Sequence, residues 1–487
     1  PVEIVLSDSR IGARGIDRLR VDADFRAGAV DFTADAALPG LAGRASGSAR
    51  PFDRVPAVEA TGTLDQFDLA TLLGDPARDV RLRGDFAIEG RGTSLQTLVG
   101  SAAVTLDDAV VRTGERTLRF AGADLDAIVR GGTAIFDADV ALADGGQVAA
   151  VGAVEIDQAP LAYRVTQGRV AGLDLSALTG DPAQASDLTG SFTLEGRGVD
   201  PQLATITATV DLAPSTVPVS GGLRLADARA NARLSGGVVT FDAAADLADA
   251  GSATATGSVR PFAQPLTYEA SGTVSRLNLA ALTGDETRES DLSGAFTARG
   301  SGVDPATLTT SGTLRITEPG YVLGRNVDSA DLTFSLARGD LALGGRLDVP
   351  GLSLTGIDVT GRPFAETPSF SLGETTCFKD LDIKELADTS VKTNLTGCFR
   401  GSITGFELLA ATGSGVVTLD PSQVNEAEVT GGEVSFSLVD GDLSAQVDLD
   451  FEPPPPDPEP EASGETAAPE TSRLVAVFNG RLFDEEP

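Results

Sequence analysis

Residues 172–201 read GLDLSALTGDPAQASDLTGSFTLEGRGVDP, and this stretch decides the fold because the chain repeats it. Residues 276–305, RLNLAALTGDETRESDLSGAFTARGSGVDP, match it over the same length. Shorter copies occur within residues 66–92 and 380–399. Similar segments at constant spacing are typical of repeat proteins, in which each unit packs against its neighbours. The chain is therefore predicted to be a repeat protein.

The spacing of the copies sets the predicted organisation. Their anchor glycines lie 106, 104 and 103 residues apart, at Gly84, Gly190, Gly294 and Gly397. This period predicts a partial repeat at residues 1–59 and four repeat units at residues 60–164, 165–270, 271–372 and 373–487. Residues 452–472 are rich in Pro and Glu, and we expect a disordered or extended insertion there.

The first part of each copy predicts a short helix. One position in every copy holds a good N-cap residue, namely Asp68, Asp174, Asn278 and Asp382. An apolar residue precedes each cap and a Leu follows it four positions later, which is the spacing of a hydrophobic staple. Glycines that can adopt a left-handed conformation end the helix in three copies, at Gly74, Gly180 and Gly284. In the fourth copy Asp388 stands near that position.

The residues between the helices predict strands. Apolar residues alternate with Thr, Ser, Asp and Arg, as in the series Val239, Phe241, Ala243, Ala245 and Leu247. This period-two pattern is typical of a strand with one apolar face, and each repeat has room for roughly seven such strands. We expect a tight turn at Arg338-Gly-Asp340.

A sheet built this way has one apolar face that few elements can cover. The predicted helices are short, and aromatic residues make up only 5% of the chain. We therefore expect an all-β fold: one long, curved, repetitive antiparallel sheet around an apolar groove, with one short helix per repeat of about 104 residues. Roughly 30 strands at about 4.8 Å each would extend on the order of 140 Å.

Candidate residues for the lining of this groove lie at apolar positions of the alternating segments. They are Phe86, Ile88, Phe192, Leu194, Val239, Phe241, Leu247, Phe296 and Phe334. Small and aliphatic side chains offer no fixed polar contact, so a hydrocarbon chain could slide along them. An ordinary closed core remains the alternative interpretation of the same alternation.

Composition excludes several classes of function. The formal charge of −34 repels nucleic acid, so no DNA or RNA partner is expected. The chain has no His, no P-loop motif and no cysteine spacing suited to zinc, so we predict neither an enzyme nor a metal or cofactor site. Acidic, Lys-poor composition is typical of a GC-rich, halophilic source, with plain solubility charge as the alternative.

Two further features bear on location. No run of about 18 apolar residues is present, so no helical membrane span is expected, and the absence of Met predicts a fragment or processed product. Cys377 and Cys398 are 21 positions apart. In an oxidising compartment they could form a disulfide across the fourth helix, and in the cytosol two isolated thiols are the alternative.

The repeated helix, strand and Val-Asp-Pro turn resemble the AsmA-like and TamB family of envelope proteins, through all four units. The resemblance implies a β-taco with a hydrophobic groove, located in the periplasm and anchored in the inner membrane by a segment outside this chain. It also implies that phospholipid acyl chains are the cargo and move between the inner and outer membranes. An outer-membrane barrel of the BamA or TamA kind is an implied partner.

Two alternatives to lipid conduction are kept. The first is an assembly factor for outer-membrane β-barrel proteins or autotransporters, which would receive client strands at a sheet edge. The second is an extracellular structural or adhesive β-repeat protein, which would have a closed core without lipid.

Overall fold

The computed structural model describes all residues except 12–13, 74–78, 114–115, 144, 219–221, 303–306, 323, 388–389, 406–410, 440–441, 453–471 and 482–487. Strands account for 72% of the structure and helices for 6%. The strands form one antiparallel sheet of 32 strands and one separate two-stranded hairpin. The predicted all-β repetitive antiparallel sheet with few short helices is therefore confirmed. Almost all of the predicted insertion at 452–472 lies outside the described residues.

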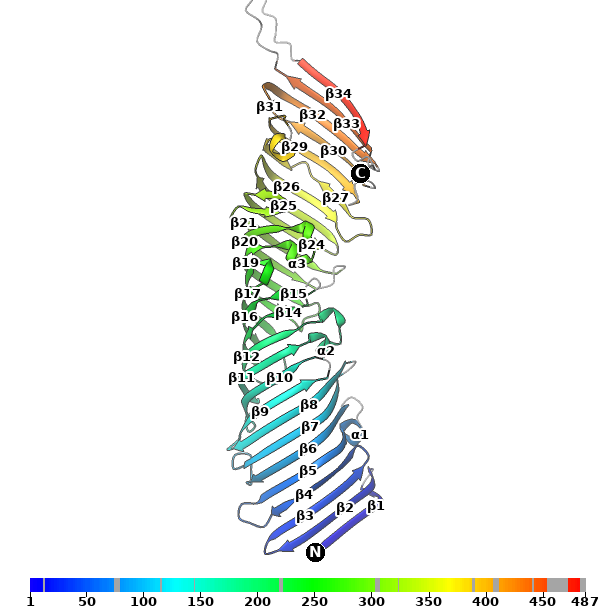
Figure 1. The fold of residues 1–487 in the computed structure, drawn as a ribbon, viewed down its shortest axis with the longest axis vertical. Helices are drawn as coiled ribbons and strands as arrows, with labels where there is room; N and C mark the ends of the chain where they lie inside the picture. Colours follow the sequence, from blue (N-terminus) through cyan, green and yellow to red (C-terminus); the bar gives the residue numbers. More distant parts are fainter. Residues whose placement is uncertain are drawn as a thin grey trace, which may run out of the picture. The chain divides into compact units, whose positions relative to one another are not determined.

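The chain divides into two compact units, Pro1–Ala248 and Asp249–Pro487. In unit 1 the strands of the main sheet pair antiparallel in the order of the chain, and only one short hairpin is passed over (Figure 1). The strands are β1 (Val2–Ile11), β2 (Arg14–Arg26), β3 (Ala29–Leu38), β4 (Leu41–Arg50), β5 (Ala57–Asp68), β6 (Val80–Arg91), β7 (Val99–Thr113), β8 (Arg116–Arg130), β9 (Thr133–Leu142), β10 (Gln147–Glu155), β11 (Ala162–Leu173), β12 (Leu188–Arg197), β13 (Thr205–Leu212), β16 (Asp227–Ser235) and β17 (Val238–Asp246). The hairpin that is passed over is β14 (Ser215–Val217) with β15 (Leu223–Leu225), which lies between β13 and β16 in the chain.

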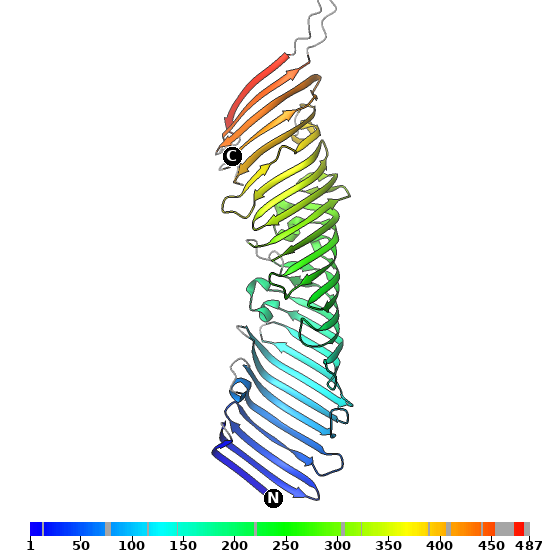
Figure 2. The same cartoon turned by 180° about the vertical axis from the view of Figure 1, so that it is seen from behind.

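Unit 2 follows the same plan, as the view from behind in Figure 2 also shows. Its main strands are β18 (Ser252–Arg260), β19 (Thr267–Leu277), β20 (Ser290–Ser301), β21 (Thr309–Ile316), β24 (Ser329–Ala337), β25 (Asp340–Val349), β26 (Leu352–Arg362), β27 (Ser369–Leu372), β28 (Cys377–Leu381), β29 (Thr393–Thr404), β30 (Thr412–Leu419), β32 (Ala427–Val439), β33 (Asp442–Phe451) and β34 (Ser472–Arg481). Short strands β22 (Gly320–Val322), β23 (Arg325–Val327) and β31 (Ser422–Val424) lie at strand ends. β27 and β28 follow each other between β26 and β29 and pair with both.

Four short helices recur at the predicted interval. They are α1 (Leu69–Leu73), α2 (Leu175–Thr179), α3 (Leu279–Thr283) and α4 (Ile383–Ala387). Three-residue 3-10 turns occur at η2 (Pro182–Gln184), η3 (Ala248–Ala250) and η4 (Glu286–Arg288). The division between the units falls inside the predicted repeat at 165–270, and the proposed repeat boundaries themselves stay a prediction.

All four predicted N-caps are confirmed. The side-chain oxygens accept hydrogen bonds from backbone amides of the first helical turn: Asp68 from Thr71 (3.0 Å), Asp174 from Ser176 (2.8 Å), Asn278 from Ala280 (3.0 Å) and Asp382 from Lys384 (3.0 Å). Gly180 and Gly284 end α2 and α3 with φ of 72° and 70°, as predicted. Gly74 and Asp388 lie outside the described residues.

At α2, α3 and α4, a hydroxyl from the chain segment after the helix forms hydrogen bonds with the backbone at the start of that helix. The Ser290 Oγ accepts a hydrogen bond from the Leu279 amide at 2.7 Å and donates one to the Leu277 carbonyl at 2.9 Å. Ser186 and Thr393 make the equivalent pairs around α2 and α4. Each hydroxyl thereby satisfies an amide that a helix terminus would otherwise leave unpaired.

The tight turn predicted at Arg338-Gly-Asp340 is also present. Arg338 and Gly339 both have positive φ, 53° and 87°. Positive φ at both central residues matches a type I′ hairpin turn, whose twist suits the flanking strands β24 and β25.

Candidate functional site

The two faces of the sheet differ in exposure, residue by residue. In β12, Phe192 and Leu194 are half-buried, whereas Thr193 and Glu195 between them are exposed. Residues paired across neighbouring strands point to the same face. The ladder pairings therefore show which residues form a continuous apolar face.

In unit 1 this face contains a row without a polar residue, from β1 to β17. Successive ladder partners along it are Ile4, Val21, Ala34, Ala45, Gly62, Phe86, Val104, Leu125, Ala138, Ala150, Gly168, Phe192, Val210, Ala230 and Ala243. We call this series the unit 1 apolar row. Each of its residues comes from a different strand, so the row runs across the strands and along the sheet.

Unit 2 has a row of the same kind, from β18 to β34. Its successive partners are Gly257, Ala270, Ala298, Gly312, Phe334, Leu343, Val359, Leu372, Gly401, Gly415, Phe436, Ala445 and Phe478. We call it the unit 2 apolar row. It too has no polar side chain.

The apolar face is open near the middle of the strands and covered near one end. Ile88 is 40% exposed, Leu125 38% and Phe436 39%, and no second sheet packs on them among the described strands. Near the helix-bearing strand ends of unit 2, Val322 and Val327 of the β22–β23 hairpin pack against Ile316 and Ala330. There Ile383 of α4 likewise packs against Phe378, Leu395 and Leu419. The covered part is ordinary core, and the open part is the candidate site.

Aromatic rings extend over glycines of the neighbouring strand. A Cβ built on Gly62 would stand 2.7 Å from the Phe86 ring, and one on Gly312 would stand 2.8 Å from the Phe334 ring. The same holds for Gly168 with Phe192 and Gly415 with Phe436, at 2.5 Å in both cases. The ring thus occupies the space above the glycine, a pairing known to strengthen strands that contain glycine. The consequence is an apolar surface of low relief.

The structure places eight of the nine predicted lining residues on the apolar face. Phe86 and Phe192 belong to the unit 1 apolar row, and Leu194 and Phe241 share a neighbouring row through Ala208 and Ala232. Ile88 and Val239 lie in further rows of unit 1, and Phe296 and Phe334 lie in unit 2. Leu247 differs, because it follows the end of β17 and is only 9% exposed. A buried position beyond the strand cannot line an open surface.

Sequence reasoning missed several residues of this face. Val104, Leu125 and Val210 lie in the unit 1 apolar row, and Phe436 lies in that of unit 2. The available signal was a glycine on one strand opposite an aromatic residue on the next, as in Gly415 and Phe436. That signal becomes readable only once the strand register is known.

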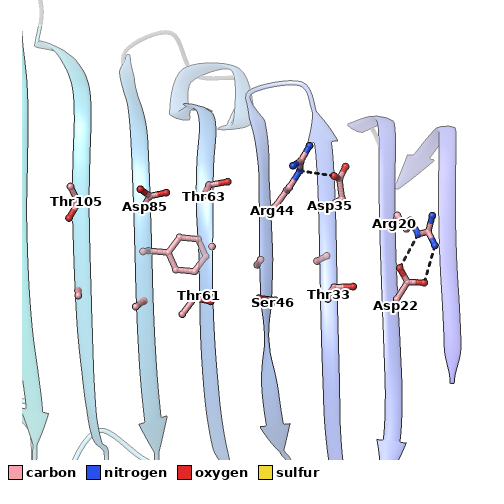
Figure 3. A pocket seen from close by; sticks show the side chains of 16 residues that line it. Arg20, Asp22, Thr33, Asp35, Arg44, Ser46, Thr61, Thr63, Asp85 and Thr105 are labelled. Atoms are coloured by element: carbon pink, nitrogen blue, oxygen red, sulfur yellow. Dashed lines mark hydrogen bonds and ion pairs between the residues drawn. The ribbon is translucent and has the colours of Figure 1, made fainter.

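Hydroxyl and charged side chains make up most of the lining of two hollows of the sheet. Figure 3 shows one in unit 1, of about 740 Å³, lined by Thr, Ser, Asp and Arg side chains together with Ala34, Ala45, Gly62 and Phe86 of the unit 1 apolar row. Its arginines are paired: Arg20 with Asp22 at 2.9 Å and Arg44 with Asp35 at 3.1 Å (Figure 3). A second hollow of about 670 Å³ in unit 2 is lined by Thr and Ser residues and also by residues of the unit 2 apolar row, among them Gly312 and Phe334. Hydroxyls and compensated charges suit solvent contact and do not assemble a nucleophile with a base.

The structure joins Cys377 of β28 to Cys398 of β29 in a disulfide. The two residues are ladder partners, as are the adjacent Phe378 and Gly397. Phe378 faces the buried cluster, so the disulfide lies on the opposite, polar face. It therefore crosslinks the sheet without entering the candidate site.

Comparison of the chain with family models, with curated proteins and with solved structures gives no match. Within the described residues, no helix has both the length and the apolar character needed to cross a membrane. The same residues contain no cluster of three or more side chains suited to hold a metal ion. The two apolar rows are therefore the candidate functional site of this chain.

Proposed function

We propose that the protein carries lipid acyl chains on its apolar face and conducts phospholipid between the inner and outer membranes of a bacterial envelope. The observation that carries this proposal is the unbroken apolar row in each unit, open in the middle of the strands. An exposed apolar surface of this extent is unfavourable in water unless a ligand or partner covers it.

The energetics favour a hydrocarbon ligand. Moving an acyl chain of about 16 carbons into water costs on the order of 13 kcal/mol, at about 0.8 kcal/mol per methylene. Because every strand contributes an apolar residue to the row, an acyl chain on the row stays out of water at each position along it. No polar side chain interrupts either row, so no step along the row requires a polar group to lose water.

Low relief favours movement over fixed binding. Rings that extend over the glycines fill the space beside them on the row. The periplasmic location and the inner-membrane anchor outside this chain are part of the proposal, and the resemblance to the AsmA-like and TamB family supports them.

Photo-crosslinking at adjacent residues of one strand tests the proposal. Benzoylphenylalanine at Phe192, on the apolar face, should crosslink to phospholipid in cells, whereas the same group at Thr193 should not. The two positions are adjacent in β12 and point to opposite faces of the sheet. Equal lipid adducts at both positions, or none at Phe192, would overturn the proposal.

A further inference from the structure

In unit 1, a group of hairpin tips lies at the strand ends opposite the helices. Three tips, at residues 51–56, 92–98 and 131–132, connect β4 to β5, β6 to β7 and β8 to β9. They are bonded side by side: the Gly92 amide donates to the Pro56 carbonyl at 3.1 Å, and the Gly131 amide donates to the Leu98 carbonyl at 3.1 Å. The Ile156 amide donates to the Gly132 carbonyl at 2.8 Å in the same way, so a fourth tip, at residues 156–161, continues the surface that these tips form.

The first three tips contain more arginines than carboxylates, whereas the fourth adds Asp157. Residues 50–57, 91–99 and 130–133 contain four arginines, Arg50, Arg54, Arg91 and Arg130, and one carboxylate, Asp53. We call these arginines the basic rim. None of the four has an ion-pair partner among the described residues, unlike Arg20 and Arg44 on the same sheet.

Three arginines of the basic rim, Arg50, Arg91 and Arg130, stand at regular intervals set by the strand register. Arg50 pairs with Ala57, which pairs with Arg91; Arg91 pairs with Val99, which pairs with Arg130. One arginine thus stands on every second strand, at intervals of about 9.6 Å. The three line a hollow of about 510 Å³ that also contains Glu59 and Glu89, which lie further in along the strands. The outermost positions of the hollow are the positive ones.

Large apolar side chains project from the same tips. Phe52 is 78% exposed, Val55 50% and Leu95 48%. The sequence Arg-Pro-Phe at 50–52 recurs at the equivalent hairpins of unit 2, residues 260–262 and 362–364, where Phe262 and Phe364 are 46% and 62% exposed. In unit 1 the three apolar side chains project from neighbouring tips, and a group of exposed apolar side chains rimmed by polar residues is typical of an interaction surface.

We propose that the hairpin tips of unit 1 dock on a bilayer surface that contains anionic phospholipid. The basic rim contacts the phosphates, and Phe52, Val55 and Leu95 enter the interfacial region. Guanidinium groups form paired hydrogen bonds with phosphate oxygens, and an amphipathic tip suits the boundary between headgroups and acyl chains. The chain's net charge of −34 acts weakly here, because at physiological ionic strength charges act over about 8 Å, and the carboxylates of the hollow, Glu59 and Glu89, lie further in along the strands than the arginines.

This inference does not depend on the apolar rows, since the tips lie at the strand ends and the arginines stand on the polar face. Vesicle flotation of the full chain tests it, using phosphatidylcholine vesicles with and without phosphatidylglycerol. The chain should float with the anionic vesicles and not with the neutral ones. The triple variant Arg50→Gln, Arg91→Gln, Arg130→Gln should lower the partition coefficient on the order of 100-fold, at about 1 kcal/mol per arginine near the surface.

Two further variants make the test specific. Phe52→Ser should weaken flotation about tenfold, because a partly inserted ring loses its apolar contact. The control Arg83→Gln, Arg119→Gln, Arg169→Gln removes the same charge from exposed positions away from these tips and should float like the wild type. Failure of the wild type to float, equal flotation with neutral vesicles, or an equal loss in the control would each overturn the proposal.

Discussion

The ring of Phe192 lies so close to Gly168 of the neighbouring strand that a Cβ on Gly168 would stand 2.5 Å from the ring. The two residues are ladder partners in the unit 1 apolar row. The contact joins two properties of the sheet, because it stabilises adjacent strands and keeps the apolar face low in relief.

The first prediction concerns this contact. Gly168→Ala should destabilise the protein by about 1–3 kcal/mol, since the methyl group forces the Phe192 ring or the strand to move. Gly90→Ala is the matched control on the same face, where the new Cβ would be 3.7 Å from its nearest neighbour. Urea unfolding followed by circular dichroism gives both values. Equal midpoints for the two variants would show that the ring contact is not tight.

The second prediction concerns the helix start closed by Ser290, which is 4% exposed. Ser290→Ala should cost about 1–3 kcal/mol, because the Leu279 amide and the Leu277 carbonyl lose their buried partner. Ser290→Thr should retain most of the stability, since Thr393 makes the equivalent bonds at α4. Thermal unfolding compares the three proteins, and a Thr variant as unstable as the Ala variant would contradict the account.

The third prediction concerns pH. Hydrogen bonds from the Ser176 hydroxyl and amide, and from the Ser186 amide, lower the pKa of Asp174 below the ordinary 3.8. A lowered pKa in the folded state means that the carboxylate contributes stability at neutral pH and that this contribution is lost as the pH falls below about 4. Asp174→Asn should keep the cap, as Asn278 does at α3, and remove this part of the acid sensitivity. Unfolding midpoints of both proteins between neutral and acid pH test it, and parallel curves would contradict the assigned role.

The fourth prediction concerns the disulfide. Closing a loop across 21 positions should stabilise unit 2 by about 3 kcal/mol, chiefly by restricting the unfolded chain. Cys377→Ala with Cys398→Ala should therefore lower the unfolding midpoint but leave lipid binding unchanged, because the pair lies on the polar face. Loss of bound lipid in this variant would place the cysteines in the binding surface instead.

The parts of the fold that depend on local sequence could be predicted. The caps Asp68, Asp174, Asn278 and Asp382 act within one helical turn, and alternation assigns Phe192 and Leu194 to one face of a single strand. The pairing register between neighbouring strands could not be predicted from the sequence, because β-bulges shift it at places such as Val151/Gly152. Without register, the Phe–Gly pairs and the continuity of the rows are invisible.

The ends of the strands also could not be predicted from the sequence. Leu247 continues the alternation of β17 yet lies beyond the strand in a buried position. The β22–β23 hairpin covers part of the apolar face through Val322 and Val327, and no periodic signal marks three-residue strands. The basic rim was missed for a similar reason, because its arginines are far apart in sequence and meet only through the ladder.

The central claim is tested most directly by mass spectrometry of phospholipid bound to the natively purified chain. Leu125→Asp introduces a charge into the unit 1 apolar row, whereas Thr193→Asp places the same charge on the polar face of β12. Leu125 is 38% exposed and Thr193 is exposed, so neither change disrupts a core. We expect phospholipid on the wild type and on Thr193→Asp, and several-fold less on Leu125→Asp. A wild-type chain without phospholipid, or equal amounts on the two variants, would contradict the account.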